Sequence, residues 1–317
     1  MNPVNTAQPL KPRVLFVDDE PRVLTSMKML FFGNQYQAFF AESGEKALEL
    51  LKTQRVDVIV SDQRMPGMTG IELLRAAREL NPNAMRILLT GYADLDAIIG
   101  SINDGEIFRF VNKPWSNDDL TTTVARAITA ARASAVAARR TGEVVQPLGP
   151  VPGVLVLDDD PSVPGKIQTI LGTGYRVFGT TTMEQAVNLL ERERIGVVIS
   201  DTRVQDHPVL GLISTLKKHH PELVSVILTE RADAGAAIDL INQGQIYRFI
   251  TKPMHDSVCK ITVNSALRQH HRLAQAPELQ QRYEVAAPTE PLPTAVTPTG
   301  RLLDRVRSLR SWVTRRA

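Results

Sequence analysis

Short apolar runs alternate with amphipathic stretches along most of this chain. In its first third the apolar runs are RVLFV (13–17), a weaker QAFFA (37–41), DVIVS (57–61), MRILLT (85–90) and IFRFVN (107–112). The stretches between them include the helix-period segments SGEKALELLKTQ (43–54) and GIELLRAARELNP (70–82). Five strands that alternate with helices predict an α/β domain whose parallel sheet is covered on both faces. In such a sheet, functional side chains gather at the carboxyl ends of the strands.

The same pattern occurs a second time, at an offset of about 140 residues. The segment INDGEIFRFVNKP (102–114) aligns with INQGQIYRFITKP (241–253), and eight of the thirteen positions are identical. FVDDEP (16–21) likewise aligns with VLDDDP (156–161). Solenoid repeats are only about 20 to 50 residues long, so a repeat of this length indicates a duplicated domain.

The repeat sets the expected domain organisation. We predict one α/β domain over 13–130 and a second over 153–268, each with a parallel five-stranded sheet. Residues 131–152 read as an Ala-rich helical extension followed by a Pro/Gly linker. Residues 1–12 and the Pro-, Thr- and Ala-rich segment 269–298 have no periodic apolar pattern, which predicts disorder.

The composition is that of a globular protein, with 43% hydrophobic and 22% charged residues. The single cysteine, Cys259, excludes a disulfide within the chain and suits a reducing compartment. The first residues lack the apolar core of a signal peptide, and no stretch reaches the ~18 apolar residues of a membrane span. We therefore expect a cytoplasmic protein.

The net charge of +3 conceals a strongly basic C-terminal segment, 299–317. Its last seventeen residues carry six Arg and one Asp, so the other 300 residues have a net charge of −2. On a helix, Leu302, Val306, Leu309 and Val313 would form one apolar stripe, which Leu303 and Trp312 widen. Such a basic amphipathic helix binds a partner protein, packs on its own domain, or lies on an anionic membrane surface, here the inner membrane. We expect no direct DNA binding, because the basic residues lie in a tail and not on a domain face.

Charged and hydroxyl side chains follow four of the predicted strands in the first repeat. Asp18 and Asp19 follow the first strand, Asp62 the third, Thr90 the fourth and Lys113 the fifth. Two carboxylates 4 Å apart repel by ~4 kcal/mol at an effective dielectric near 20, so this cluster needs a cation or a raised pKa. Mg²⁺, which takes oxygen ligands and several waters, fits best. Asp62 could then attack a phosphoryl donor, while Lys113 neutralises phosphoryl charge and Thr90 donates a hydrogen bond.

This ordered set resembles the receiver domain of two-component response regulators, which has a flavodoxin-like, doubly wound (βα)5 fold. The motifs are DD after the first strand, SDQRMPGMTG around Asp62, LTG after the fourth strand and KP after the fifth. LTGYADLDAIIGSINDGEIFRFVNKPW looks like receivers of hydrogenase-type regulators. The resemblance implies that Asp18, Asp19, Asp62 and the backbone carbonyl of Arg64 bind Mg²⁺. It also implies phosphorylation of Asp62 by a sensor histidine kinase or a histidine phosphotransfer protein.

The resemblance further implies a switch. Thr90 and an aromatic three residues before the lysine, Phe110, are expected to move together on phosphorylation, and the Lys113–Pro114 bond is expected to be cis. There is no recognisable output domain in the sequence, so we expect the output to pass to a downstream protein target by protein contact.

The second repeat carries the same set with departures around it. Its equivalent positions are the metal ligands Asp158, Asp159 and the Arg203 carbonyl, the phosphoacceptor Asp201, and Thr229, Lys252 and Phe249. MPGMTG is replaced by VQDHPVLG, which loses the Pro-Gly turn and adds Asp206, and Glu230 stands where the first repeat has Gly91. A carboxylate there should crowd and repel a phosphoryl group. We therefore predict that the second domain folds as a receiver and phosphorylates poorly.

Two other functional classes fit parts of the pattern. A scaffold that acts through its tail would need no reaction at either site. A phosphohydrolase with an aspartyl-phosphate intermediate would place its nucleophile on the first strand with a second acid two residues later, whereas Asp18 and Asp19 are adjacent. Histidine chemistry is not indicated by any spacing, so we expect all six histidines at the surface: His207, His219, His220, His255, His270 and His271.

Overall fold

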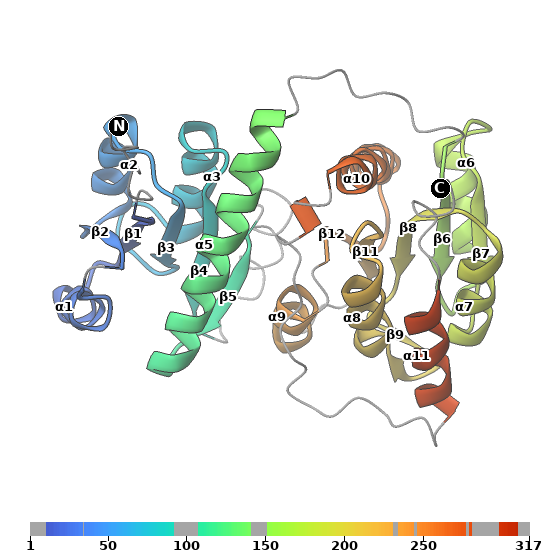
Figure 1. Cartoon of the computed structure of the whole chain (residues 1–317). Coiled ribbons are helices and arrows are strands. Elements are labelled where there is room, and N and C mark those ends of the chain that lie inside the picture. Colours follow the sequence, from blue (N-terminus) through green and yellow to red (C-terminus); the bar gives the residue numbers. More distant parts are fainter. Residues whose placement is uncertain are drawn as a thin grey trace, which may run out of the picture. The chain divides into compact units, whose positions relative to one another are not determined.

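The computed structural model describes residues 11–33, 35–91, 107–140, 151–230, 234–243, 246–276, 279–280 and 298–309. Two separate five-stranded sheets divide the chain into domain 1, from β1 to α5, and domain 2, from β6 to α11 (Figure 1). Most of the predicted N-terminal tail and of the linker after Arg140 lies outside the described residues. The prediction of two flavodoxin-like domains in tandem is confirmed.

The sheet of domain 1 has the strand order β2-β1-β3-β4-β5, the doubly wound order of a flavodoxin-like fold. Its strands are β1 (Arg13–Val17), β2 (Gln37–Ala41), β3 (Val58–Asp62), β4 (Met85–Thr90) and β5 (Arg109–Asn112). Its described helices are α1 (Pro21–Leu30), α2 (Gly44–Thr53), α3 (Gly70–Leu80) and α5 (Asn117–Arg140). The strands β1, β3 and β4 are almost wholly buried, as expected for a sheet covered on both faces.

Side-chain caps fix where these helices begin. Thr69 and Glu72 form a reciprocal capping box at the start of α3. At the start of α5, the Ser116 hydroxyl accepts the backbone N–H of Asp119 at 3.0 Å, which satisfies one of the unpaired donors of the first turn. The helix that follows runs to Arg140, as the Ala-rich sequence predicted.

Domain 2 repeats the order as β12-β11-β8-β6-β7. Its main strands are β6 (Gly153–Leu157), β7 (Val177–Thr180), β8 (Ile195–Ser200), β11 (Val224–Thr229) and β12 (Arg248–Thr251). Its helices are α6 (Val163–Leu171), α7 (Met183–Arg192), α8 (Leu210–His219), α9 (Ala234–Asn242), α10 (Asp256–Gln275) and α11 (Pro298–Ser308). A short hairpin of β9 (Arg203–Val204) and β10 (His207–Pro208) precedes α8 and has no counterpart in domain 1 among the described residues.

The C-terminal part of domain 2 differs from the prediction in the length of α10 and agrees with one of the alternatives for the basic C-terminal helix. Helix α10 runs seven residues into the segment 269–298 that we predicted to be disordered, because Leu273 and Leu279 are buried in the core beneath it. Helix α11 packs against α7 and α8 of its own domain, and it buries Leu303 and Val306. Both residues belong to the predicted, widened stripe, and packing on its own domain is one of the alternatives given for this helix; Val313 lies outside the described residues.

Two histidines are buried, which corrects the expectation that all six lie at the surface. His220 is 4% exposed and His270 is 5% exposed. His220 ends α8 as its C-cap residue, and the Nδ1 atom of His270 lies 2.8 Å from the Glu222 carbonyl oxygen. Burial is tolerated because each ring has a backbone hydrogen-bond partner.

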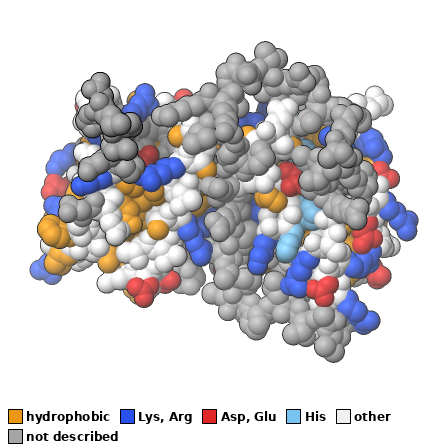
Figure 2. Space-filling model, viewed as in Figure 1, with side chains coloured by type: hydrophobic (Ala, Val, Ile, Leu, Met, Phe, Trp, Pro, Cys, Tyr) orange, Lys and Arg blue, Asp and Glu red, His pale blue; other side chains and the backbone are white. Residues whose placement is uncertain are grey.

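The described surface mixes charges of both signs. On the face shown in Figure 2, Lys and Arg side chains are interspersed with Asp and Glu. No helix in the described parts of the chain has the length and apolar character needed to cross a membrane.

Candidate functional site

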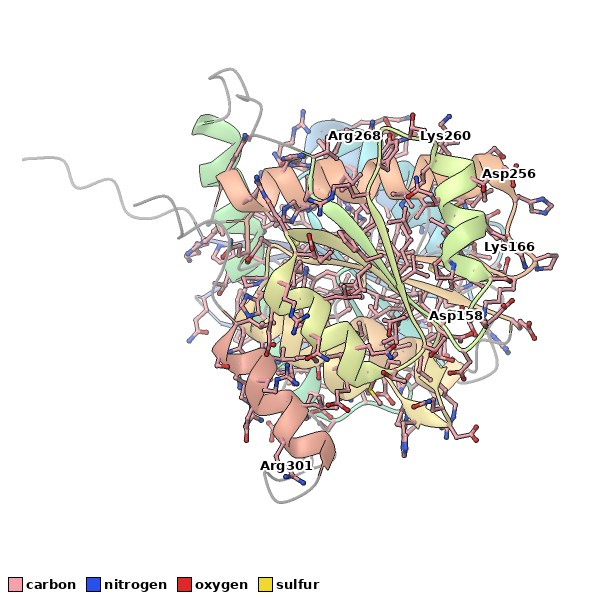
Figure 3. The ribbon with its side chains drawn as sticks, turned by 90° about the vertical axis from the view of Figure 1, so that its right-hand side faces the viewer. Asp158, Lys166, Asp256, Lys260, Arg268 and Arg301 are labelled. Atoms are coloured by element: carbon pink, nitrogen blue, oxygen red, sulfur yellow. The ribbon has the colours of Figure 1, made fainter. Side chains whose placement is uncertain are left out.

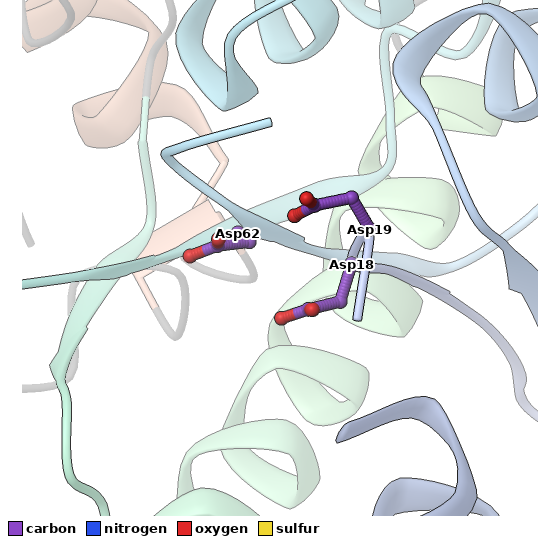
Figure 4. A group of neighbouring side chains, drawn as sticks. All are labelled: Asp18, Asp19 and Asp62. Carbon is purple, nitrogen blue, oxygen red and sulfur yellow. The ribbon is translucent and has the colours of Figure 1, made fainter. Parts of the chain in front are cut away.

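Three carboxylates converge at the carboxyl edge of the domain 1 sheet. The parallel pairing of β1 with β3 sets Val17 beside Ser61, so Asp18 and Asp62 follow at neighbouring strand ends. One oxygen from each of Asp18, Asp19 and Asp62 lies within 4.8 Å of the others (Figure 4). Asp18 is fully buried and Asp62 is 5% exposed. The prediction that these three residues meet is therefore confirmed.

Lys113 is the cation that faces this cluster. Its ammonium nitrogen lies 2.7 Å from Oδ1 of Asp62 and 3.4 Å from Oδ2 of Asp18. The backbone N–H of Lys113 donates to the carbonyl of Thr90 at 2.9 Å, which fixes the end of β5 beside the end of β4. The Lys113–Pro114 peptide bond is cis, as the resemblance implied.

The charges in this cluster are only partly balanced. Burial raises the pKa of Asp62 and of Asp18, and Lys113 offsets only part of that shift for each. Burial also disfavours the charged form of Lys113, yet hydrogen bonds to Asp62 and Asp18 outweigh it and raise the pKa of its ammonium group. Three carboxylates and one ammonium leave excess negative charge in a poorly hydrated place. A hard divalent cation with oxygen ligands fits this donor set.

The other predicted site residues of domain 1 lie at the same strand ends. Thr90 is 1% exposed and its hydroxyl donates to the carbonyl of Gly91 at 3.1 Å. Phe110 lies in β5 and is 3% exposed. Arg64 is the second residue after Asp62, and the role of its carbonyl as a ligand stays a prediction, as do the switch roles of Thr90 and Phe110.

Gly70 is a positioning residue that the sequence analysis missed. It begins α3, and its N–H donates to the carbonyl of Gln63 at 3.0 Å. A Cβ atom on Gly70 would lie 2.1 Å from the carbonyl oxygen of Asp62, so no other residue fits without moving the Asp62 backbone. The signal was present as the last glycine of MPGMTG. The equivalent residue in domain 2 is Val209, which requires a different loop path there.

Domain 2 places its equivalent residues at the same sheet edge. The ammonium nitrogen of Lys252 lies 2.7 Å from Oδ2 of Asp158 and 2.9 Å from Oδ2 of Asp201. Its backbone N–H donates to the carbonyl of Thr229 at 2.9 Å, and the Lys252–Pro253 bond is cis. Figure 3 shows Asp158 at the end of its strand. The placement of Asp158, Asp201 and Lys252 therefore matches that of Asp18, Asp62 and Lys113 in domain 1.

The third acid of domain 2 does not join this group. Asp159 accepts the backbone N–H of Gln205 with both carboxylate oxygens, at 2.9 and 3.0 Å. Gln205 and Asp206 form the turn of the β9–β10 hairpin with φ of 50° and 61°, in the left-handed region. Among the described residues, only the domain 1 acids come within 4.8 Å of one another as a group of three. The prediction that Asp159 is a metal ligand equivalent to Asp19 therefore has no geometric support.

The remaining predicted residues of domain 2 are in place around the site. Thr229 and Phe249 are buried, at 3% and 2% exposure. Glu230 is exposed and lines an open cavity of about 1090 Å³ together with Lys252 and residues of α6. Arg203 lies in the β9 strand of the hairpin, and its carbonyl as a ligand stays a prediction.

Comparison with known proteins agrees with this architecture. The family model of the response regulator receiver domain matches residues 14–125 and again 154–264. The hydrogenase transcriptional regulatory protein HoxA of Cupriavidus necator is 39% identical over 117 residues, which are 37% of this chain and 24% of HoxA. Sporulation initiation phosphotransferase F of Bacillus subtilis is 32% identical over 111 residues, which are 35% of this chain and 89% of that protein. The chain thus spans about a quarter of HoxA and most of the phosphotransferase.

Solved structures give matches of similar extent. The signal receiver domain of an HD domain-containing protein from Pseudomonas fluorescens is 34% identical, and the match covers 39% of this chain and 98% of that chain with a TM-score of 0.38.

Proposed function

The chain belongs to the response regulator receiver family in both of its domains, and on this basis we propose that it is a phosphorylation-driven switch of a cytoplasmic two-component phosphorelay. Its donor would be a sensor histidine kinase or a histidine phosphotransfer protein. Its phosphoacceptor would be Asp62, and its output would pass to a protein target by contact. Asp201 would serve as a second and poorer acceptor.

The chain's own residues account for each part of the transfer. A carboxylate oxygen of Asp62 would attack the phosphorus of a phosphohistidine, so that a P–O bond forms as the P–N bond breaks and its electron pair returns to the imidazole. The Lys113 ammonium, 2.7 Å from Asp62, would neutralise charge on the phosphoryl oxygens. The buried hydroxyl of Thr90 would donate to the product. Asp18, Asp19 and Asp62 would bind Mg²⁺, which supplies further charge neutralisation when bound.

The observation that best supports this proposal is that oxygens of three carboxylates lie within 4.8 Å of one another at the sheet edge, and that Lys113 pairs with one of them, Asp62. The test is incubation of the full chain with acetyl phosphate and Mg²⁺, followed by intact mass and peptide mapping. We expect the phosphoryl group mainly on Asp62 and much slower labelling of Asp201. Asp62→Asn should therefore remove most of the label, whereas Asp201→Asn should leave most of it.

Two results would contradict the proposal. Labelling of Asp62→Asn at the wild-type rate would assign the chemistry to another residue, and no labelling in the wild-type chain would favour the scaffold alternative. The phosphohydrolase alternative predicts continuous turnover of a generic phosphate ester by the same preparation. A receiver should not turn over such an ester, so phosphate release from the ester separates these two classes.

A further inference from the structure

The C-terminal helix is seated on the second domain by both apolar and polar contacts. Helix α11 packs against α7 and α8, and Figure 3 shows it alongside α7 with Arg301 at its first turn. Leu303 is 2% exposed and Val306 is fully buried, so the contact removes one face of α11 from water.

Arg305 makes the principal polar contact of α11. Its Nε atom donates to Oε1 of Glu191 at 2.9 Å, and its Nη2 atom donates to Oε2 of the same carboxylate at 2.6 Å. The Nη2 atom also donates to Oδ1 of Asn188 at 2.6 Å. A bidentate guanidinium–carboxylate pair fixes orientation as well as adding energy, since both planes must align. The hydrogen bond from Arg305 lowers the pKa of Glu191.

His220 adds a contact next to Arg305, near the C-terminal end of α11. Its Nε2 atom lies 3.1 Å from the carbonyl oxygen of Val306, which can only accept. That carbonyl lies in the last turn of α11, where it also accepts the Leu309 N–H at 3.3 Å, and carbonyl groups at a helix end need partners from outside the helix. The buried imidazole of His220 therefore caps the C-terminal end of the helix, and Arg305 orients it along α7.

Domain 1 shows that this surface is particular to domain 2. The equivalent positions follow from the matched ends of α2 and α7 and of α3 and α8. Lys52 stands at the position of Glu191, and it pairs with Glu49 of its own helix. Asn81 stands at the position of His220, and it bonds within domain 1 to the Val56 N–H and the Leu51 carbonyl. Domain 1 therefore has a cation at the position where the Glu191 carboxylate binds Arg305, and a cation there cannot pair with an arginine.

We propose that the α7–α8 face of domain 2, formed by Asn188, Glu191 and His220, is a recognition site for helix α11 of the same chain. Domain 2 then works as an anchor that covers the apolar face of the basic C-terminal helix. This role goes beyond the proposed phosphorelay function, because it requires no reaction at Asp201. Release of α11 would expose Leu303 and Val306 beside arginine side chains, which is a surface that another protein or an anionic membrane could bind.

The test uses charge reversal in the full chain, with hydrogen exchange of the α11 amides as the readout. Arg305→Glu should lower the protection of the Val306 to Leu309 amides by about tenfold or more, because it replaces a charge-assisted pair with repulsion. Arg301→Glu makes the same change of charge on an exposed residue of the same helix and should leave protection within about twofold. Adding Glu191→Lys to Arg305→Glu should restore protection.

A peptide-binding experiment distinguishes specific recognition of α11 by the α7–α8 face from a general destabilisation of domain 2. A fluorescent peptide of residues 298–309 should bind the Arg305→Glu chain, whose site is vacated, and should not bind the wild-type chain. A chain with Glu191→Lys should instead bind the peptide that carries Arg305→Glu. Unchanged melting of domain 2 and unchanged labelling of Asp62 would show that the variants fold.

Three outcomes would overturn the proposal. The first is unchanged α11 protection in Arg305→Glu, and the second is failure of the reversed pair to recover. The third is α11 protection that rises with protein concentration, because the helix would then dock on a second copy of the chain. Loss of Asp62 labelling in the wild type would refute the phosphorelay function without affecting any of these results.

Discussion

The carboxylate of Asp159 accepts the backbone N–H of Gln205 with both of its oxygens, at 2.9 and 3.0 Å. The equivalent acid in domain 1, Asp19, lies instead within 4.8 Å of Asp18 and Asp62. Domain 2 therefore uses the second acid of its pair to stabilise a hairpin turn that domain 1 lacks. The Lys252 ammonium lies within 2.9 Å of both remaining acids, so less uncompensated charge is left to attract a divalent cation.

The Mg²⁺ affinity of the chain should depend on Asp19 and not on Asp159. Asp19→Asn should weaken Mg²⁺ binding to the full chain by about tenfold, because it removes one charged ligand from a group of three. Asp159→Asn should leave the Mg²⁺ affinity unchanged and should increase exchange of the Gln205 amide. Calorimetric titration of both variants measures the first effect and hydrogen exchange the second. Equal losses of affinity in the two variants would show that Asp159 is a ligand after all.

The residue that follows the threonine of each site, Gly91 in domain 1 and Glu230 in domain 2, should affect the rate of phosphorylation. Gly91→Glu places a carboxylate next to Thr90, as Glu230 stands next to Thr229, and should slow acetyl phosphate labelling of Asp62 at least about tenfold by repulsion. Glu230→Gly should not by itself bring Asp201 to the rate of Asp62, because the Asp159–Gln205 contact remains. Peptide mapping over time measures the labelling rate of each aspartate. If Asp201 in Glu230→Gly were labelled as fast as Asp62, then Glu230 alone would account for the slow phosphorylation of domain 2.

Gly70 should tolerate no side chain. Gly70→Ala places a Cβ atom 2.1 Å from the Asp62 carbonyl oxygen, and we expect it to destabilise domain 1 by roughly 2 kcal/mol and to impair labelling of Asp62. Gly91→Ala is the matched control, because a Cβ atom there meets nothing within 4 Å. Thermal melting and acetyl phosphate labelling are the measurements. Similar behaviour of the two variants would mean that the loop before α3 yields easily.

These features differ in how far the sequence could reveal them. The two sheets and the meeting of Asp18, Asp62 and Lys113 were predictable, because strand periodicity is local and the carboxyl ends of parallel strands must share an edge. The path of the loop after Asp201 was not, since Gln205 and Asp206 adopt positive φ without a glycine to signal it.

The burial of single polar residues could not be predicted from the sequence either. The burial of His220 and His270 depends on backbone carbonyls that approach from segments distant in the chain, and no spacing within α8 or α10 indicates it. For α11 the amphipathic pattern was visible, yet the pattern alone left a partner protein, the chain itself and a membrane surface open as binding partners. The Arg305–Glu191 pair distinguishes them, and it joins residues 114 positions apart.

The metal-free site of domain 1 should make the protein less stable as the pH rises. Burial raises the pKa of Asp62 and Asp18, so the folded protein binds more protons than the unfolded chain just above the ordinary carboxyl pKa. Stability is then lost as the pH rises from about 4 through the raised pKa values of the two carboxyl groups. Asp62→Asn should raise the melting temperature at about pH 7 in EDTA, and this gain should shrink at lower pH. Asp118→Asn, on the exposed first turn of α5, is the control.

Added Mg²⁺ should remove the difference in melting temperature between Asp62→Asn and the wild-type chain. Metal binding to the ionised cluster stabilises the folded state by mass action, and Asp62→Asn lacks one ligand. The wild-type chain should therefore gain more melting temperature from Mg²⁺ than the variant at about pH 7. If Asp62→Asn melted below the wild type in EDTA at about pH 7, the ionised Asp62 would not destabilise the folded protein as we expect.

His270 should make domain 2 sensitive to acid. Burial lowers the pKa of its imidazole to about 4, while in the unfolded chain it titrates near 6.5. Below pH 6.5 the unfolded chain therefore binds a proton that the folded domain does not, and stability falls as the pH drops towards about 4, by roughly 3 kcal/mol in total. His270→Gln keeps a donor for the Glu222 carbonyl and cannot titrate, so its unfolding free energy should fall much less over this window. The exposed His255→Gln should behave as the wild type in denaturant titrations between about pH 4.5 and 6.5, and equal slopes for all three proteins would assign the acid sensitivity to other groups.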